Sequence, residues 1–115
     1  MIWLKDLYIG ESARPRIQKI LKAAEADKPP KKESALLIIL SLHPKAQLDI
    51  VSLKEIHHAI YADASLMVLG AAGNKKEALS LVERITADCL KASGAPFLKE
   101  YFATREFVPR KEVVL

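Results

Sequence analysis

Two glycine-containing segments hold the residue types that a small-anion site requires. One segment begins at Gly10 and contains Ser12, and the other runs from Gly70 to Asn74. Each follows an apolar stretch and precedes a predicted helix, whose first N–H groups and positive dipole end favour a phosphate or a carboxylate. Glycine lets such a group approach the backbone closely. The candidate ligand-binding residues are Gly10, Ser12, Gly70, Gly73, Asn74 and Lys75.

The same glycines have a simpler interpretation as ordinary turn residues. Their spacing matches neither the dinucleotide motif G-x-G-x-x-G nor the phosphate-binding P-loop. Glycine is common where a strand ends before a helix, because it tolerates positive φ. If the two preceding strands run parallel, both helix starts open at one end of the sheet, where α/β folds bind ligands.

The remaining ionisable residues do not support catalysis or metal binding. His57 and His58 are neighbours, so on a helix their rings point about 100° apart and cannot easily share a metal. Glu55 and His58 have the i, i+3 spacing of di-metal carboxylate sites, but the pair is not repeated. Cys89 falls on the apolar stripe of a predicted helix, where cysteine behaves as a small hydrophobe. We therefore predict no catalytic residue, no metal and no cofactor, which favours a protein that is not an enzyme.

Positive charge is concentrated in one segment. The chain has a net charge of +4, and residues 14–32 contain seven basic and two acidic side chains. Such a patch could attract an acidic protein or a phosphate backbone, but a solvated helix face is the favoured interpretation, because basic surface faces are common. No aromatic residue lies between Tyr8 and Tyr61, and this disfavours nucleic acid, whose single strands stack on aromatic rings.

Aromatic side chains near the two ends of the chain favour association with another protein chain. Aromatic residues are enriched in the cores of interfaces, and two-fold dimers dominate among small soluble oligomers. The alternative is that the rings close the domain's own core. The candidate interface residues are Trp3, Phe97, Tyr101, Phe102 and Phe107.

Hydrophobic periodicity predicts an α+β fold, a two-layer α/β sandwich in the order β-α-β-β-α-β-α. A mixed sheet of about four strands is expected, with strands at 2–9, 34–42, 48–53 and 65–69. The second and third strands must pair antiparallel, because their connection is short. The strand over 34–42 is apolar at consecutive positions, which is typical of a strand covered on both faces.

Two main helices and one short helix are expected. The first begins at an N-cap at Ser12 and ends before Pro29. A short helix is predicted over 53–62. The second main helix begins at Asn74, with Glu77 three residues later as in a capping box, and ends at Gly94.

The length of 115 residues predicts one domain over 1–103. Residues 104–115 form a tail, either disordered or an edge strand. The single cysteine fits a reducing compartment, the N-terminus does not have the pattern of a signal peptide, and the longest apolar run, 35–40, is too short to span a membrane. We predict a cytoplasmic protein that does not bind membranes.

Residues 2–10 (IWLKDLYIG) and 66–82 (LMVLGAAGNKKEALSLV) resemble a set of small bacterial proteins of similar length without an assigned function. That set has an M-I-x-L-K start and a later strand–Gly–helix segment. The resemblance implies a cytosolic bacterial domain, and it carries no catalytic residues. The Pro-Pro-Lys-Lys loop and the long tail depart from it.

The sequence therefore favours a non-enzymatic interaction or structural module that forms a homodimer. The alternative is a binder of a small anionic ligand or nucleotide at the two glycine-flanked helix starts.

Overall fold

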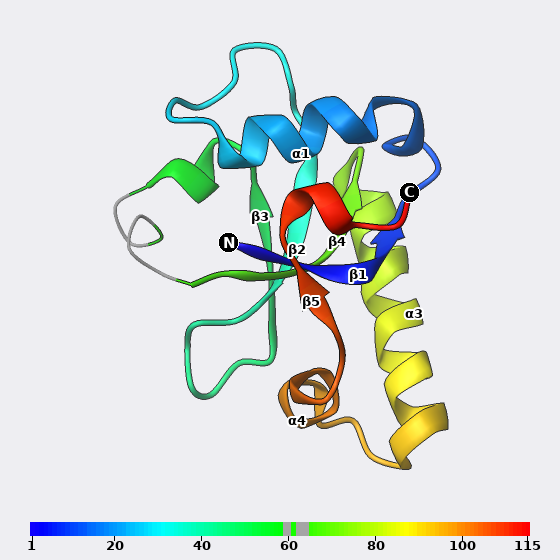
Figure 1. Ribbon diagram of the computed structural model, residues 1–115. Coiled ribbons are helices and arrows are strands. Elements are labelled where there is room, and N and C mark those ends of the chain that lie inside the picture. The colour runs from blue at the N-terminus through cyan, green and yellow to red at the C-terminus, as the bar shows by residue number, and fades with distance from the viewer. Residues whose placement is uncertain (59–60, 62–64) are drawn as a thin grey trace.

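Five apolar segments form a mixed sheet with the strand order β3-β2-β4-β1-β5 (Figure 1). The structure, a computed structural model, describes residues 1–58, 61 and 65–115. β1 and β4 pair in parallel, and every other pair of neighbours is antiparallel. The short connection between β2 and β3 makes the predicted antiparallel hairpin. The strands are β1 (Ile2–Ile9), β2 (Leu36–Leu40), β3 (Leu48–Ser52), β4 (Met67–Ala72) and β5 (Phe107–Val108).

Helical segments lie on both faces of the sheet. One core cluster packs α1 on the sheet, and a second packs α3 and α4 on the opposite face. Among the described residues, no helix is long and apolar enough to cross a bilayer. The helical segments are η1 (Arg14–Arg16), α1 (Ile17–Glu25), η2 (Glu55–His57), α3 (Lys75–Ser93), α4 (Leu98–Ala103) and η3 (Arg110–Glu112).

The α+β class and the mixed sheet are confirmed, but the sheet has five strands rather than about four, and three layers replace the expected two. The cause lies in the central strands, where successive side chains point to opposite faces. Leu37 and Ile39 of β2 belong to the cluster on the α1 side, whereas Ile38 belongs to the cluster on the α3 side. A strand that is apolar in both phases needs cover on both faces.

Several predicted boundaries are wrong. β4 does not end at Gly70 but runs to Ala72, because it continues to pair with β1. Ser12 does not cap a helix: the 3₁₀ turn η1 precedes α1, and the N-cap of α1 makes no side-chain hydrogen bond. The helix predicted over 53–62 contains the 3₁₀ turn η2, while residues 59, 60 and 62 of that prediction lie outside the described part.

The C-terminal segment lies along the outer edge of β1. Phe107 and Val108 pair antiparallel with Leu4 and Trp3, and this gives the fifth strand. Beyond η3, the backbone N–H of Val114 donates to the carbonyl of Lys5 at 2.9 Å. The segment therefore covers one of the two edges of the sheet within the same chain.

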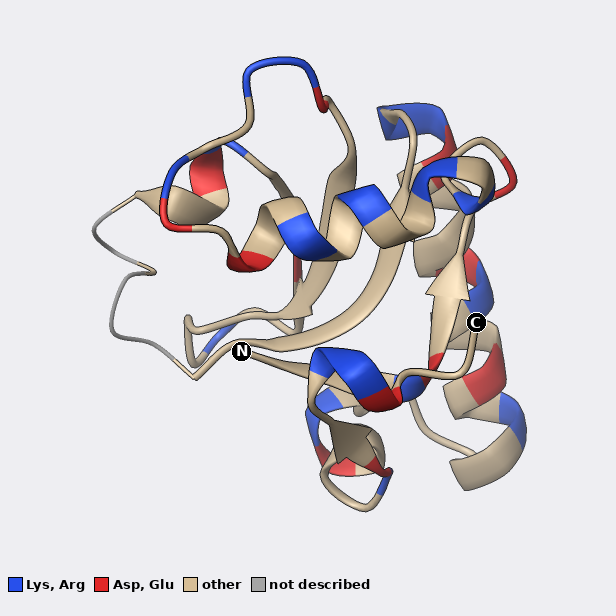
Figure 2. Ribbon diagram, turned by 45° about the horizontal axis from the view of Figure 1, so that its top comes forward, with Lys and Arg blue, Asp and Glu red and all other residues tan. Residues whose placement is uncertain are grey.

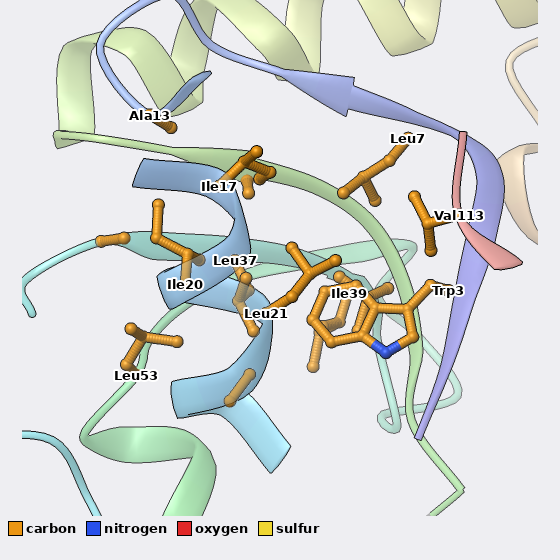
Figure 3. Packing of buried hydrophobic residues seen from close by; sticks show 14 of the residues in the cluster. Trp3, Leu7, Ala13, Ile17, Ile20, Leu21, Leu37, Ile39, Leu53 and Val113 are labelled. Carbon is orange, nitrogen blue, oxygen red and sulfur yellow. The ribbon is translucent and has the colours of Figure 1, made fainter. Parts of the chain in front are cut away.

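Two of the five candidate interface rings are core residues of this chain. Trp3 is fully buried among aliphatic side chains of the α1 layer (Figure 3). Its indole Nε1 donates to Glu25. Phe102 is buried in the cluster on the other face. The interface assignment of Trp3 and Phe102 is wrong, because neither ring reaches the surface. Tyr101 and Phe107 are half-buried, and Phe97 alone of the five is exposed, at 58%.

Replacing Trp3 by alanine is expected to lower the free energy of unfolding by about 3–5 kcal/mol, the usual cost of removing a buried aromatic ring. Phe97→Ala removes an exposed ring and should change it by less than about 0.5 kcal/mol. Urea unfolding followed by circular dichroism measures both. Equal effects of the two substitutions would contradict the burial of Trp3.

Candidate functional site

The parallel pairing of β1 and β4 brings the two glycine segments to the same end of the sheet. Tyr8 and Ile9 of β1 lie beside Gly70 and Ala71 of β4. The chain then leaves β1 toward α1 on one face and leaves β4 toward α3 on the other (Figure 1). Adjacent parallel strands whose connections diverge in this way leave a crevice at their carboxyl ends, which is where open α/β sheets bind ligands.

A pocket of about 360 Å³ lies in this crevice. Both signs of charge line it, since Glu11 and Glu77 contribute carboxylates and Lys76 and Arg84 contribute cations. A pocket of this size falls in the range that small molecules occupy. The lining residues are Ile9, Gly10, Glu11, Asn74, Lys76, Glu77, Ser80, Leu81 and Arg84.

The backbone donors of this crevice already hold an anion, the carboxylate of Glu77. The N–H of Gly73 donates to Glu77 Oε1 at 2.8 Å, and the N–H of Ser12 donates to Oε2 at 3.0 Å. The hydroxyl of Ser12 donates to Oε1 at 2.9 Å. This is why Ser12 does not cap α1. We call this set of hydrogen bonds the Glu77 latch.

Gly10 and Gly73 leave the space that the latch occupies. A Cβ on Gly10 would lie 1.9 Å from Glu77 Oε1, and a Cβ on Gly73 would lie 2.0 Å from Ser12 Oγ. Gly70 lies inside β4, where a Cβ would meet the carbonyl oxygen of Tyr8 at 3.0 Å. The close approach that the sequence suggested is therefore an approach within the chain.

The six candidate ligand-binding residues divide into two groups. Gly10, Ser12, Gly73 and Asn74 lie together around the Glu77 carboxylate or at the start of α3; Asn74 Oδ1 accepts from the Glu77 N–H at 2.9 Å. Gly70 lies within β4. Lys75 does not line the pocket, whereas its neighbour Lys76 does. Sequence reasoning missed Glu77 as a crevice residue, although its capping-box position was visible.

The environment of Glu77 makes its carboxylate a weak base. Burial raises the pKa of Glu77, but the hydrogen bonds from Gly73 and Ser12 outweigh burial and hold the pKa below its ordinary value. A general base needs a pKa near the working pH. The Ser12–Glu77 contact is therefore suited to holding two loops together and not to activating the serine.

Beside the latch, α3 is also held against β1. The Tyr8 hydroxyl donates to Asp88 at 2.5 Å, and the Arg84 guanidinium lies 5.6 Å from the centre of the Tyr8 ring. Burial, followed by the hydrogen bond and the charge of Asp88, raises the pKa of Tyr8 far above its ordinary value. The phenol therefore keeps its proton at neutral pH.

The other chemically suggestive residues have structural contacts. Both ring nitrogens of His57 lie 2.8 Å from carbonyl oxygens, those of Leu53 and Ala26. Glu55 accepts from the Ser52 N–H at 2.9 Å, and Cys89 is fully buried. In the described part of the chain, no three His, Cys, Asp or Glu side chains converge as they would to hold a metal ion.

The basic segment 14–32 lies over α1 and the following loop (Figure 2). Arg16 forms a salt bridge with Glu33, and this pairing neutralises one of the positive charges of the segment. Lys19 and Lys22 are exposed on the outer side of α1, opposite its buried stripe. This arrangement agrees with a solvated helix face.

Comparison of the chain with protein-family models, curated proteins and solved structures found no match. Its function must therefore be argued from its own residues.

Replacing Glu77 by glutamine is expected to lower the free energy of unfolding at neutral pH by about 1 kcal/mol, the usual value of a capping interaction. Because the folded-state pKa is lowered, the stabilisation is present above the unfolded-state pKa and is lost as the pH falls through the folded-state pKa. The difference between wild type and Glu77→Gln should therefore shrink in acid. Urea titrations at several pH values measure it, and a difference that grows in acid would refute the latch.

Gly10→Ala should displace the Glu77 side chain and so lower the free energy of unfolding by about 1 kcal/mol. In a Glu77→Ala background the new methyl group has room, so the same substitution should be neutral within about 0.5 kcal/mol. A double-mutant cycle gives the coupling between the two positions. Additive effects would show that Gly10 and Glu77 do not meet.

Proposed function

We propose that this chain is a non-enzymatic interaction module that forms a homodimer through the outer edge of β3. The observation that carries the proposal is the edge itself: β3 ends the sheet, and no strand of the described residues pairs with its outer side. An edge of this kind offers a row of backbone N–H and C=O groups to another strand.

β3 has few of the features by which proteins block an exposed edge. Such edges are usually short, carry lysine or proline, or contain a bulge. β3 has five residues, LDIVS, with Asp49 as its one charged side chain and no lysine or proline, and it pairs with β2 without a register shift. The opposite edge, β5, has only two residues. The two edges of the sheet are therefore not equivalent.

The hydrogen-bond pattern identifies the groups that point outward. The N–H of Ser41 donates to Gln47, and the N–H of Leu53 donates to Ala35, so odd-numbered residues of this segment face β2. Leu48, Ile50 and Ser52 therefore direct their backbone groups away from the sheet. The N–H of Ser52 is taken by Glu55, which leaves those of Leu48 and Ile50 for a partner strand.

An apolar surface lies next to this edge on the α3 side. Leu36, Leu48 and Ile50 are only half-buried, although they pack on the core cluster of that face. Cover is incomplete because α3 lies over β4, β2 and β1, and β3 lies beyond them at the end of the sheet. The edge and the half-covered apolar face are continuous.

The two flanks of α3 also differ in polarity. One flank carries Glu77, Arg84 and Asp88, which contact β1 and the loop after it. Leu79 and Leu90 project from the other flank, which therefore lies toward β2 and β3, and they are 49% and 44% exposed. This second flank extends the apolar surface beyond the strands.

A second copy of the chain complements this edge in one register. Antiparallel pairing centred on Ile50 places Leu48 opposite Ser52 and Asp49 opposite Val51 of the partner subunit, so no like charges lie opposite each other. It uses the N–H groups of Leu48 and Ile50 and leaves the Ser52–Glu55 hydrogen bond intact. A two-fold axis normal to the sheet would keep the half-exposed apolar faces of both copies on the same side.

The alternative, a binder of a small anion or nucleotide at the glycine-flanked helix starts, has less support. Its donors at Ser12 and Gly73 are engaged by the Glu77 carboxylate, and two carboxylates line the pocket. An anion would have to displace Glu77 before it could use those donors.

At tens of micromolar, light scattering should give twice the chain mass of 12.8 kDa. Ile50→Lys should shift the protein to the monomer, because the new charge would face its own copy across the two-fold axis. Leu79→Lys, on the flank of α3, should weaken the dimer in the same way.

Val114→Lys is the matched control, since Val114 is 55% exposed and its N–H donates to Lys5 of β1, toward the opposite edge of the sheet from β3. It should leave the dimer intact, and thermal unfolding would show that all three variants are folded. A wild-type monomer at these concentrations would overturn the proposal.

A further inference from the structure

A largely apolar cavity of about 570 Å³ lies at the end of the sheet opposite the Glu77 latch. Leu40 and Leu42 form one wall at the end of β2, and Met67 forms another at the start of β4. The third wall is the outer side of α4, where Lys99 and Ala103 are one helical turn apart. This volume and this apolar lining are typical of small-molecule sites.

Hydrogen bonds between the β2–β3 turn and α4 hold this cavity in shape. Lys99 Nζ donates to the carbonyl of His43 at 2.9 Å. Gln47 Nε2 donates to the carbonyl of Pro96 at 2.9 Å, and Gln47 Oε1 accepts from the Leu98 N–H at 2.5 Å. The walls therefore belong to elements fixed relative to one another.

The side chains around the cavity differ from those of the latch crevice. The described residues that line it include no carboxylate, and the ammonium of Lys99 is their one charged group. An ammonium has three donors, and the His43 carbonyl takes one of them. Ser41, which is 6% exposed, adds a hydroxyl group to the wall that contains Leu40.

Apolar side chains continue from the cavity to the surface. Leu42 is 48% exposed, and Ile2, which pairs with Met67 across the parallel strands, is 38% exposed. A ligand that extended along this surface would cover them, and its acidic end would meet Lys99. Among the described lining residues, the apolar walls and the single cation favour a ligand that is both apolar and acidic.

We propose that this cavity binds a small amphipathic carboxylate, with its alkyl chain on Leu40, Leu42 and Met67 and its carboxylate on Lys99 Nζ. The site lies apart from the latch crevice, and its occupancy does not depend on the homodimer. A charge-assisted hydrogen bond fixes the head group, and burial of the chain supplies most of the affinity.

Decanoate, used below its micelle-forming concentration, tests the proposal by isothermal titration and by the NMR signals of the Met67 and Leu42 methyl groups. We expect saturable binding with shifts of both signals. Lys99→Met should weaken binding roughly tenfold or more, which corresponds to loss of one hydrogen bond to a charged group. Lys99→Arg should retain most of the affinity.

Lys76→Met, in the latch crevice, is the matched control and should leave decanoate binding unchanged. Decanol should bind about as weakly to the wild type as decanoate binds to Lys99→Met. Absence of saturable decanoate binding, equal affinity in Lys99→Met, or equal affinity for decanol would each overturn the proposal. Circular dichroism establishes that each variant is folded before its affinity is compared.

Discussion

The parallel pairing of β1 with β4 is the constraint on which the rest of this structure depends. Two adjacent parallel strands need crossover connections, and here the connections leave on opposite faces of the sheet. The central strands are consequently covered on both faces, and their side chains are apolar on both faces. The same pairing brings the loop at Gly10 against the start of α3, where the Glu77 carboxylate joins them.

The latch and the contacts beside it join α3 to β1 and to the loop that follows β1. Ser12 holds the start of the helix through Glu77, and Tyr8 holds its middle through Asp88. On this face α3 lies over β4, β2 and β1, and β3 at the end of the sheet keeps only partial cover. The helix that closes the crevice thus leaves the β3 edge partly exposed. One arrangement disfavours an anion site and at the same time leaves an apolar edge for a partner.

Local signals in the sequence were enough to predict much of the fold. The apolar run at Leu36–Leu40 and the short loop after it predicted an antiparallel hairpin, and Asn74 and Gly94 marked the ends of α3. The strand order and the three layers depend on contacts between distant segments. Pairing of the tail with β1, which adds the fifth strand, had been only one of two expectations for residues 104–115.

The candidate site shows the same division. The sequence identified glycines that permit a close approach, and a carboxylate at the capping position of α3. It could not show that this carboxylate turns toward Ser12, 65 residues earlier, and fills the space that the glycines leave. The aromatic residues were equally ambiguous, because a ring near a chain end has the same pattern whether it closes the core, as Trp3 does, or remains exposed, as Phe97 does.

Amide hydrogen exchange at β3 tests the central claim, self-association through this edge, most directly. The N–H groups of Asp49 and Val51 face β2 and should be protected at every protein concentration. Those of Leu48 and Ile50 point outward, so they should be protected when the dimer forms and should exchange rapidly on dilution. Rapid exchange of Leu48 and Ile50 at all concentrations, with Asp49 and Val51 still protected, would contradict the account.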